Sequence, residues 1–100
     1  MKTNPLVKQI VNLAGEKKAE DLITLNVSKI TSLSDYFIIC SAKNLIQVKA
    51  IADNIKDNIK EKPWSTEGYE NAHWIILDYV DIVVHIFFEE TRHYYDLERI

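Results

Sequence analysis

Apolar residues recur at helical intervals in two stretches of the first 62 residues. The first stretch predicts a helix over about residues 5–18, with Asn4 as the N-cap and a proline at the first helical position. The second predicts a helix that begins after Asn44 and ends before Pro63. Gln47 completes the pattern of a capping box at its start. The apolar stripe of this second helix consists of Val48, Ile51, Ala52, Ile55 and Ile59.

Shorter periods predict five strands in the rest of the chain. Residues 22–28 alternate between apolar and polar, which indicates a half-buried strand. Residues 35–41 are apolar on both faces, which indicates a central strand. Residues 64–67 are predicted to form a short edge strand. Residues 73–78 and 82–88 are predicted to form a hairpin, because only a very short connection separates them.

A terminal helix is predicted over residues 89–99, with Glu89 and Glu90 in its first turn, where the helix dipole favours carboxylates. The expected order of elements is therefore α-β-β-α-β-β-β-α. This order predicts one α/β domain over residues 1–100, in which helices cover at least one face of a mixed sheet.

Charge is unevenly distributed along the chain. Residues 1–62 hold ten Lys and seven Asp or Glu, a net charge of +3, whereas residues 63–100 hold two Arg and eight Asp or Glu, a net charge of −6. An acidic C-terminal third would repel phosphate backbones, so nucleic-acid binding through it is not expected. It would suit a basic protein partner. From charge alone, the favoured interpretation is a solvated acidic face that serves solubility.

The only cysteine, Cys40, lies within an apolar run, so no disulfide can form within the chain and the thiol is predicted to be a buried small hydrophobe. Residues 1–5 do not resemble a signal peptide, and no apolar run approaches the ~20 residues of a membrane span. These observations predict a cytoplasmic protein.

Two aspartates offer the strongest argument for catalysis. Asp78 and Asp81 flank the predicted hairpin turn and could share a divalent cation, as paired carboxylates do in metal-dependent nucleotidyltransferases. However, they are three residues apart rather than two, and the only glycines, Gly15 and Gly68, form no phosphate-binding loop. The favoured interpretation is that both aspartates are turn residues and that the protein is not an enzyme.

The histidines do not form a metal motif either. His73, His85 and His93 could join Cys40 as zinc ligands, but no pair has the short spacing of such sites. His85 lies in an apolar strand and is predicted to be a hydrogen-bonded core or sheet-face residue. No cofactor and no metal are predicted.

The aromatic residues instead suggest a recognition surface. Strand alternation places Trp74, Ile76 and Asp78 on one face of their strand. If this face is open, they form with His85 a mixed apolar and acidic patch, which is typical of an interface hot spot. If it is covered, Trp74 is a core residue. Both possibilities remain open at this point.

The chain resembles ribosomal silencing factors of the Iojap-like family, and the resemblance covers essentially its whole length. The matching motifs are SDYFII at residues 34–39, QVKAIAD at 47–53, EG at 67–68, HWIILDY at 73–79, VVHIF at 83–87 and RHYYDLE at 92–98.

The resemblance implies a nucleotidyltransferase-like fold without its catalytic residues. It also implies binding to the large ribosomal subunit through ribosomal protein fourteen, which sterically blocks joining of the small subunit and represses translation when nutrients are scarce. Homodimers off the ribosome are a further implication. The partner-binding residues are expected to be Trp74, Ile76, Asp78 and Tyr79, with Glu67, Tyr69 and His85 beside them; Arg92 and Tyr95 are expected to fix the terminal helix or to extend the surface. The alternatives are a metal-dependent nucleotidyltransferase-like enzyme and a homodimeric scaffold.

One position departs from the family pattern, which usually has glycine where this chain has Val80. If the turn requires a positive φ there, a β-branched residue costs roughly 1–2 kcal/mol. On that premise, the substitution Val80→Gly is predicted to stabilise the protein.

Overall fold

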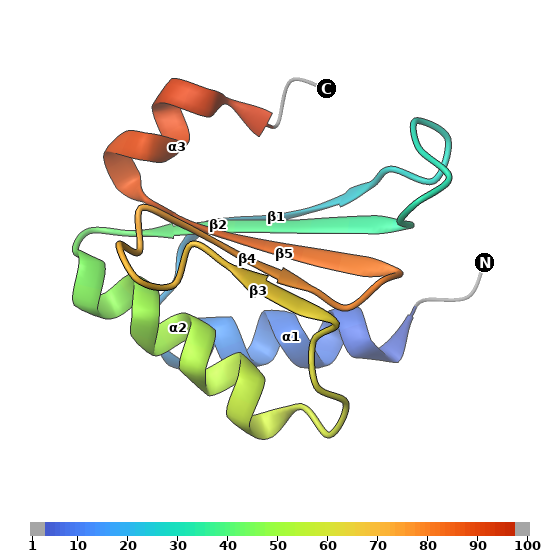
Figure 1. The fold of residues 1–100 in the computed structure, drawn as a ribbon, viewed down its shortest axis with the longest axis horizontal. Helices are drawn as coiled ribbons and strands as arrows, with labels where there is room; N and C mark the ends of the chain where they lie inside the picture. The colour runs from blue at the N-terminus through green and yellow to red at the C-terminus, as the bar shows by residue number, and fades with distance from the viewer. Residues whose placement is uncertain (1–3, 98–100) are drawn as a thin grey trace.

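The computed structural model describes residues 4–97, and these form three helices and five strands in the predicted order (Figure 1). The elements are α1 (Pro5–Glu16), β1 (Glu20–Asn26), β2 (Tyr36–Ala42), α2 (Leu45–Asn58), β3 (Ser65–Glu67), β4 (Trp74–Asp78), β5 (Ile82–Phe88) and α3 (Glu89–Tyr95). The α/β class and the α-β-β-α-β-β-β-α order are thus confirmed.

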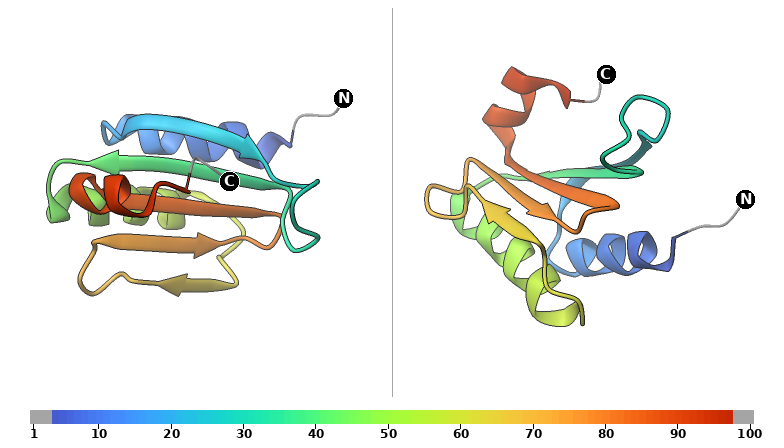
Figure 2. Two further views of the ribbon diagram at one scale, coloured as in Figure 1. Left: turned by 90° about the horizontal axis from the view of Figure 1, so that it is seen from above. Right: turned by 45° about the vertical axis from the view of Figure 1, so that its right-hand side comes forward.

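The five strands form one mixed sheet in the order β1-β2-β5-β4-β3. The strands β2 and β5 pair in parallel, from Tyr36 opposite Ile82 to Ala42 opposite Phe88. All other neighbours are antiparallel, and β4 and β5 form the predicted hairpin. The last strand of the described residues, β5, therefore lies in the middle of the sheet (Figure 2).

Helices cover the sheet unequally. Both long helices, α1 and α2, lie against one face, and α3 lies over one end of the opposite face (Figure 1). The main core fills the space between the sheet and the two long helices, with Ile10 and Ile51 from the helices against Ile38, Leu77 and Ile86 from the strands. All five side chains are fully buried, which accounts for the apolar periodicity of these elements.

The predicted N-caps are present. The Asn4 side chain accepts a hydrogen bond from the Leu6 N–H at 2.9 Å, and the Asn44 side chain accepts one from the Gln47 N–H at 2.8 Å. The predicted capping box is wrong in its second half, because the Gln47 amide does not reach back to Asn44. It donates to the carbonyls of Lys17 and Lys18, both at 3.1 Å. Gln47 therefore ties the start of α2 to the turn after α1.

Several element boundaries differ from the predicted ones. α1 ends at Glu16 rather than near Lys18, because Lys18 adopts a φ of 61°. α2 ends at Asn58, before the predicted stop. α3 ends at Tyr95, where Asp96 takes the left-handed conformation that often terminates a helix. The last residues of the predicted terminal helix, from 98 onward, lie outside the described residues.

Candidate interaction surface on the open face of the sheet

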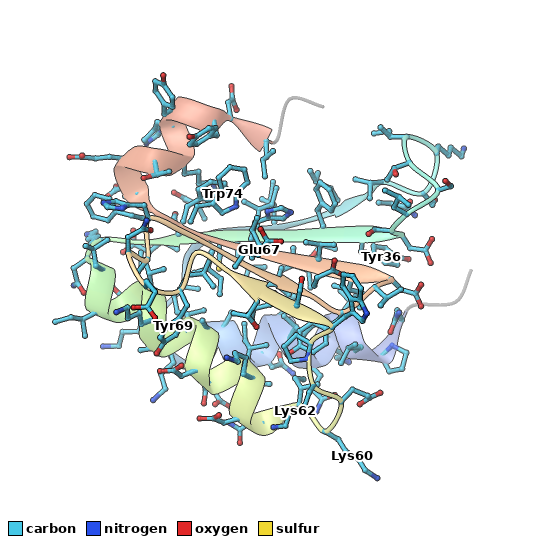
Figure 3. The ribbon with its side chains drawn as sticks, in the orientation of Figure 1. Tyr36, Lys60, Lys62, Glu67, Tyr69 and Trp74 are labelled. Carbon is cyan, nitrogen blue, oxygen red and sulfur yellow. The ribbon has the colours of Figure 1, made fainter. Side chains whose placement is uncertain are left out.

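The sheet face that α1 and α2 leave uncovered will be called the open face. Alternation along β4 places Trp74, Ile76 and Asp78 on this face, all of them half-buried. Their partners on β5 are Phe87, His85 and Val83, in that order. The buried residues Ile75 and Leu77 of β4 point the other way, into the main core. The face that carries Trp74 is therefore the one turned away from the two long helices, as Figure 3 shows for Trp74 itself.

Trp74 lies at the centre of an aromatic cluster. Its ring centroid is 4.9 Å from that of Phe87, 4.8 Å from that of Tyr95 in α3 and 5.9 Å from that of His85. These contacts hold the indole in place while part of it stays accessible. Trp74 is thus neither fully core nor fully exposed, and a rigid, half-buried aromatic side chain is the type that dominates interface energetics.

His85 is held in one tautomer by its neighbour. The Trp74 indole N–H, which can only donate, lies 3.1 Å from His85 Nδ1. Because Nδ1 must accept this bond, the proton of the neutral imidazole resides on Nε2. Burial lowers the pKa of His85 to about 4, so the neutral form is the one present near pH 7. The Nε2 atom is itself buried and has no hydrogen-bond partner among the described residues.

Arg92 fixes α3 onto the sheet. Its guanidinium is buried and donates to the Ser41 hydroxyl at 3.2 Å and to the Glu20 carbonyl at 3.4 Å. Two roles were predicted for Arg92 and Tyr95, and Arg92 has the first of them, since it fixes the terminal helix. Tyr95 is half-exposed and extends the aromatic surface beside Trp74.

The two candidate catalytic aspartates behave as turn residues. Asp78 Oδ1 accepts a hydrogen bond from the Val80 N–H at 2.8 Å, and the Asp81 carbonyl accepts from the backbone N–H groups of Asp35 and Tyr36. Within residues 4–97, no group of three or more His, Cys, Asp or Glu side chains could hold a metal ion. The local bond of Asp78 is the pattern expected of a residue that shapes a turn, whereas the Asp81 carbonyl ties the turn to the start of β2.

The loop between β1 and β2, residues 27–35, rises on the same side of the sheet as α3 but at the other end (Figure 1). Between this loop and the β4–β5 turn lies a groove of about 730 Å³. This groove will be called the loop groove. Its main apolar lining residues are Ile30, Leu33, Phe37, Trp64, Val80 and Val83, and Asp78 and His85 also line it.

Two of the predicted contact residues lie elsewhere. Tyr69 packs beside α2, where its hydroxyl donates to Asp53 Oδ2 at 3.0 Å and two lysine side chains approach its ring (Figure 3). Tyr79 packs against the main core and its hydroxyl is buried; burial raises its pKa to about 12. Neither residue shares the open face with Trp74. Glu67 does, since it lies opposite Ile76 in the β3–β4 ladder and is exposed.

The loop groove is the feature that reasoning from the sequence missed. Trp64 falls in the predicted edge strand and Val80 in the predicted hairpin turn, and no local pattern connects either residue with Leu33. The available signal was that Leu33 and Trp64 are large apolar residues in segments otherwise typical of loops. Cys40 matches its prediction, being fully buried, and burial raises the pKa of its thiol to about 12.

A sheet covered by two long helices on one face, with a half-buried aromatic cluster on the other, defines a small α/β domain. The whole chain, residues 1–100, matches the family described as ribosomal silencing factor during starvation. The protein belongs to this family.

Relatives and solved structures agree with this assignment. The chain is 38% identical to the ribosomal silencing factor of Halalkalibacterium halodurans, over 100% of this chain and 88% of that protein. It is 35% identical to the chloroplastic protein Iojap of Zea mays, over 89% of this chain and 40% of that protein. The crystal structure of protein CV0518 from Chromobacterium violaceum superposes with a TM-score of 0.93 at 32% identity, over 99% of this chain and 85% of that one.

The bacterial relatives are named as silencing factors and not as enzymes. No helix within residues 4–97 is long and apolar enough to cross a membrane.

Proposed function

We propose that this protein binds the large ribosomal subunit through ribosomal protein fourteen and thereby prevents the small subunit from joining. Translation would be repressed in this way when nutrients are limiting, in the cytoplasm where ribosomes act. The family assignment supports the silencing role. The binding partner and the steric mechanism are what the resemblance implies, and the open face supplies a surface with suitable chemistry.

The observation that carries the proposal is the half-buried patch of Trp74, Ile76 and Asp78 on the open face. An aromatic anchor beside an aliphatic residue favours a protein contact over a nucleic-acid contact. The neighbouring carboxylates, Asp78 and the exposed Glu67, favour a basic partner. Ribosomal proteins that lie against RNA meet this requirement of charge.

The shape of the domain fits a steric mechanism. The described residues form a body of 36 × 30 × 21 Å whose sheet is backed by two helices. Even the shortest of these dimensions is far greater than the separation of atoms in contact across an interface. A rigid body of this thickness, bound at a surface where two subunits meet, would hold them apart without any catalytic step.

The proposal is tested by co-sedimentation of the purified protein with separated ribosomal subunits, together with a subunit-joining assay on the same samples. Binding to the large subunit alone, with joining inhibited in proportion to occupancy, is expected. Absence of binding to the large subunit would contradict the proposal. Binding without inhibition of joining would retain the partner and remove the steric mechanism.

Variants of the patch locate the contact. Trp74→Ala and Asp78→Lys are expected to weaken binding to the large subunit. Asp78→Asn keeps an oxygen that can cap the turn and removes only the charge, so it separates charge from turn geometry.

Asp57→Lys, at an exposed position of α2 behind the sheet, is the matched control for charge reversal. Each variant requires a thermal melt, because Trp74 also packs against Tyr95. Unchanged binding by both Trp74→Ala and Asp78→Lys would exclude this patch.

A further inference from the structure

The loop groove gathers exposed apolar side chains from three separate segments. Leu33 is 81% exposed and Ile30 63% in the β1–β2 loop; Trp64 is 79% exposed before β3, and Val80 is 54% exposed in the β4–β5 turn. Single exposed apolar residues are ordinary on protein surfaces. Four large ones around one groove form a contiguous patch, and such patches mark interaction sites.

Hydrogen bonds hold the groove in shape. The Val27 N–H donates to the Asp35 carbonyl at 2.8 Å and closes the base of the loop. The Asp35 N–H donates to the Asp81 carbonyl at 2.8 Å, and the Ser34 hydroxyl donates to the Val80 carbonyl at 3.0 Å. The loop and the β4–β5 turn are thereby tied to each other. A groove with fixed walls loses little conformational freedom when it is filled, which favours binding.

The groove also contains a polar group without a partner. His85 is 94% buried (6% exposed) and lines the groove, and its Nε2 is the only buried side-chain nitrogen of residues 4–97 without a hydrogen-bond partner. The bond from Trp74 to Nδ1 makes Nε2 a donor, as described above. Buried donors are nearly always paired in native structures. An unpaired N–H beside an apolar groove therefore points to an acceptor supplied from outside the chain.

We infer that the loop groove receives an extended, basic segment of the ribosomal partner. An apolar side chain of that segment occupies the groove, and a Lys or Arg side chain pairs with Asp78. A backbone carbonyl accepts from His85 Nε2, which is covered in the free protein and becomes reachable when a side chain at the groove wall shifts. This inference rests on the proposed function and adds the chemistry by which the partner is recognised. It places the principal apolar anchor of the interface at Leu33 and Trp64, beside the patch centred on Trp74.

Charge selects this occupant over a second copy of the chain. Among the described residues that line the groove, Asp78 is the only one charged near pH 7, because His85 is neutral there. The exposed Asp35 and Asp81 lie in the segments that border the groove. A second copy would bring another C-terminal third with a net charge of −6 toward these carboxylates. A basic segment is attracted by the same charges.

A matched pair of surface substitutions tests the apolar contact. Leu33 and Ile46 are 81% and 82% exposed, but Ile46 lies at the start of α2, away from the groove. Leu33→Lys and Ile46→Lys therefore remove the same amount of packing and add the same charge. In titrations with purified large ribosomal subunits, Leu33→Lys is expected to weaken binding at least tenfold, and Ile46→Lys by less than threefold.

A second pair separates the two nitrogens of His85. His85→Asn leaves an acceptor near the position of Nδ1 for the Trp74 indole and removes the donor at Nε2. His85→Gln places an amide donor near Nε2 and removes the acceptor for Trp74. If the donor contacts the partner, His85→Asn weakens subunit binding about tenfold and His85→Gln binds more tightly than His85→Asn. A purely structural role for the Trp74 bond predicts the opposite order. Thermal melts confirm that both variants are folded.

The outcomes distinguish the inference from the proposed function. If the wild-type protein binds the large subunit and all four variants bind equally well, the proposed function stands and the loop groove is not the contact. If the wild-type protein does not bind, both fail. Sedimentation of the proteins without ribosomes tests for a second copy in the groove. If the wild-type protein is a dimer, Leu33→Lys dissociates it and subunit binding is unchanged, the groove belongs to a second copy and the inference is overturned.

Discussion

Val80 offers a direct measurement of strain at the β4–β5 turn. Its φ is 75°, and the Asp81 N–H donates across it to the Tyr79 carbonyl at 3.0 Å. A three-residue turn with a positive φ at its centre is rare and strained. The premise of the sequence-based prediction is thus confirmed. An L-residue in the left-handed region costs about 1–2 kcal/mol, and a β-branched side chain has the least room there.

The net effect of Val80→Gly follows from three opposing contributions. Relief of the backbone strain contributes about 1–2 kcal/mol. The greater freedom of glycine in the unfolded chain costs about 0.5–1 kcal/mol. Val80 is 54% exposed, so loss of its partly buried side chain costs about 0.5–1 kcal/mol. The expected change in the free energy of unfolding therefore lies between about −1 and +1 kcal/mol. The packing of Val80 in the loop groove offsets much of the gain predicted from strain alone.

Comparison of Val80→Gly with Val80→Ala isolates the strain, because both variants lose the two γ-methyl groups and they differ only in Cβ. Glycine should be more stable than alanine at this position by about 0.5–1 kcal/mol. At the exposed helical position Asp57, the order should reverse, since glycine is about 1 kcal/mol less favourable than alanine in a helix.

Urea and thermal denaturation followed by circular dichroism would measure these differences. About 1 kcal/mol shifts the melting temperature of a domain of this size by roughly 4–8 °C. If Val80→Ala proved as stable as Val80→Gly or more so, the turn would not be strained and the reasoning from its φ would be refuted.

Three further predictions follow from buried or crowded positions. Gly68 has a φ of +77° and an added Cβ would lie 2.0 Å from the Trp74 carbonyl oxygen, so Gly68→Ala should cost about 2–5 kcal/mol in urea unfolding. A Cβ added at Gly15 has no atom within 4 Å, so Gly15→Ala should instead raise the free energy of unfolding by up to about 1 kcal/mol. Equal effects of the two glycine substitutions would contradict the steric argument. Burial lowers the pKa of His85 from 6.5 to about 4. The stability that comes from keeping this side chain neutral is therefore fully present above pH 6.5 and is lost as the pH falls toward 4, a total of about 3 kcal/mol in the free energy of unfolding. Melting temperatures of His85→Asn should fall less over this range than those of the wild type; parallel curves would rule out His85 as the source. Because burial raises the pKa of Cys40 to about 12, its thiol should react with a thiol reagent only at the rate of unfolding, and rapid labelling of the folded protein would contradict this.

The elements were predictable because their patterns are local. The stripe that includes Ile51 and Ile55 marks α2, and the alternation of β4 correctly separates Trp74 from Leu77. Asn4 and Asn44 cap their helices because an asparagine side chain needs only the backbone two or three residues away. Each of these interactions is completed within a few residues.

The arrangement of the site was less predictable, because it depends on contacts between distant segments. If the alternation of β4 is continued by one residue beyond Asp78, Tyr79 falls on the same side as Leu77, which the helices cover. The position of Tyr79 was therefore predictable from the sequence. Tyr69 follows Gly68, whose positive φ redirects the chain, so no periodicity locates it. The loop groove requires residues 27–35 to lie beside the β4–β5 turn, and no local pattern specifies that contact.

The position of β5 has a consequence for how the protein is made. This strand is the last one in residues 4–97 and lies between β2 and β4, so every backbone link between the two halves of the sheet passes through it. Pairing of Tyr36 with Ile82 joins residues distant in sequence, and sheets that depend on such contacts fold slowly. A growing chain that lacks residues 82–88 has two separate ladders and no continuous open face. The surface proposed for binding therefore forms only once residues 82–88 have been made, so a chain that stops short of them lacks the proposed contact site.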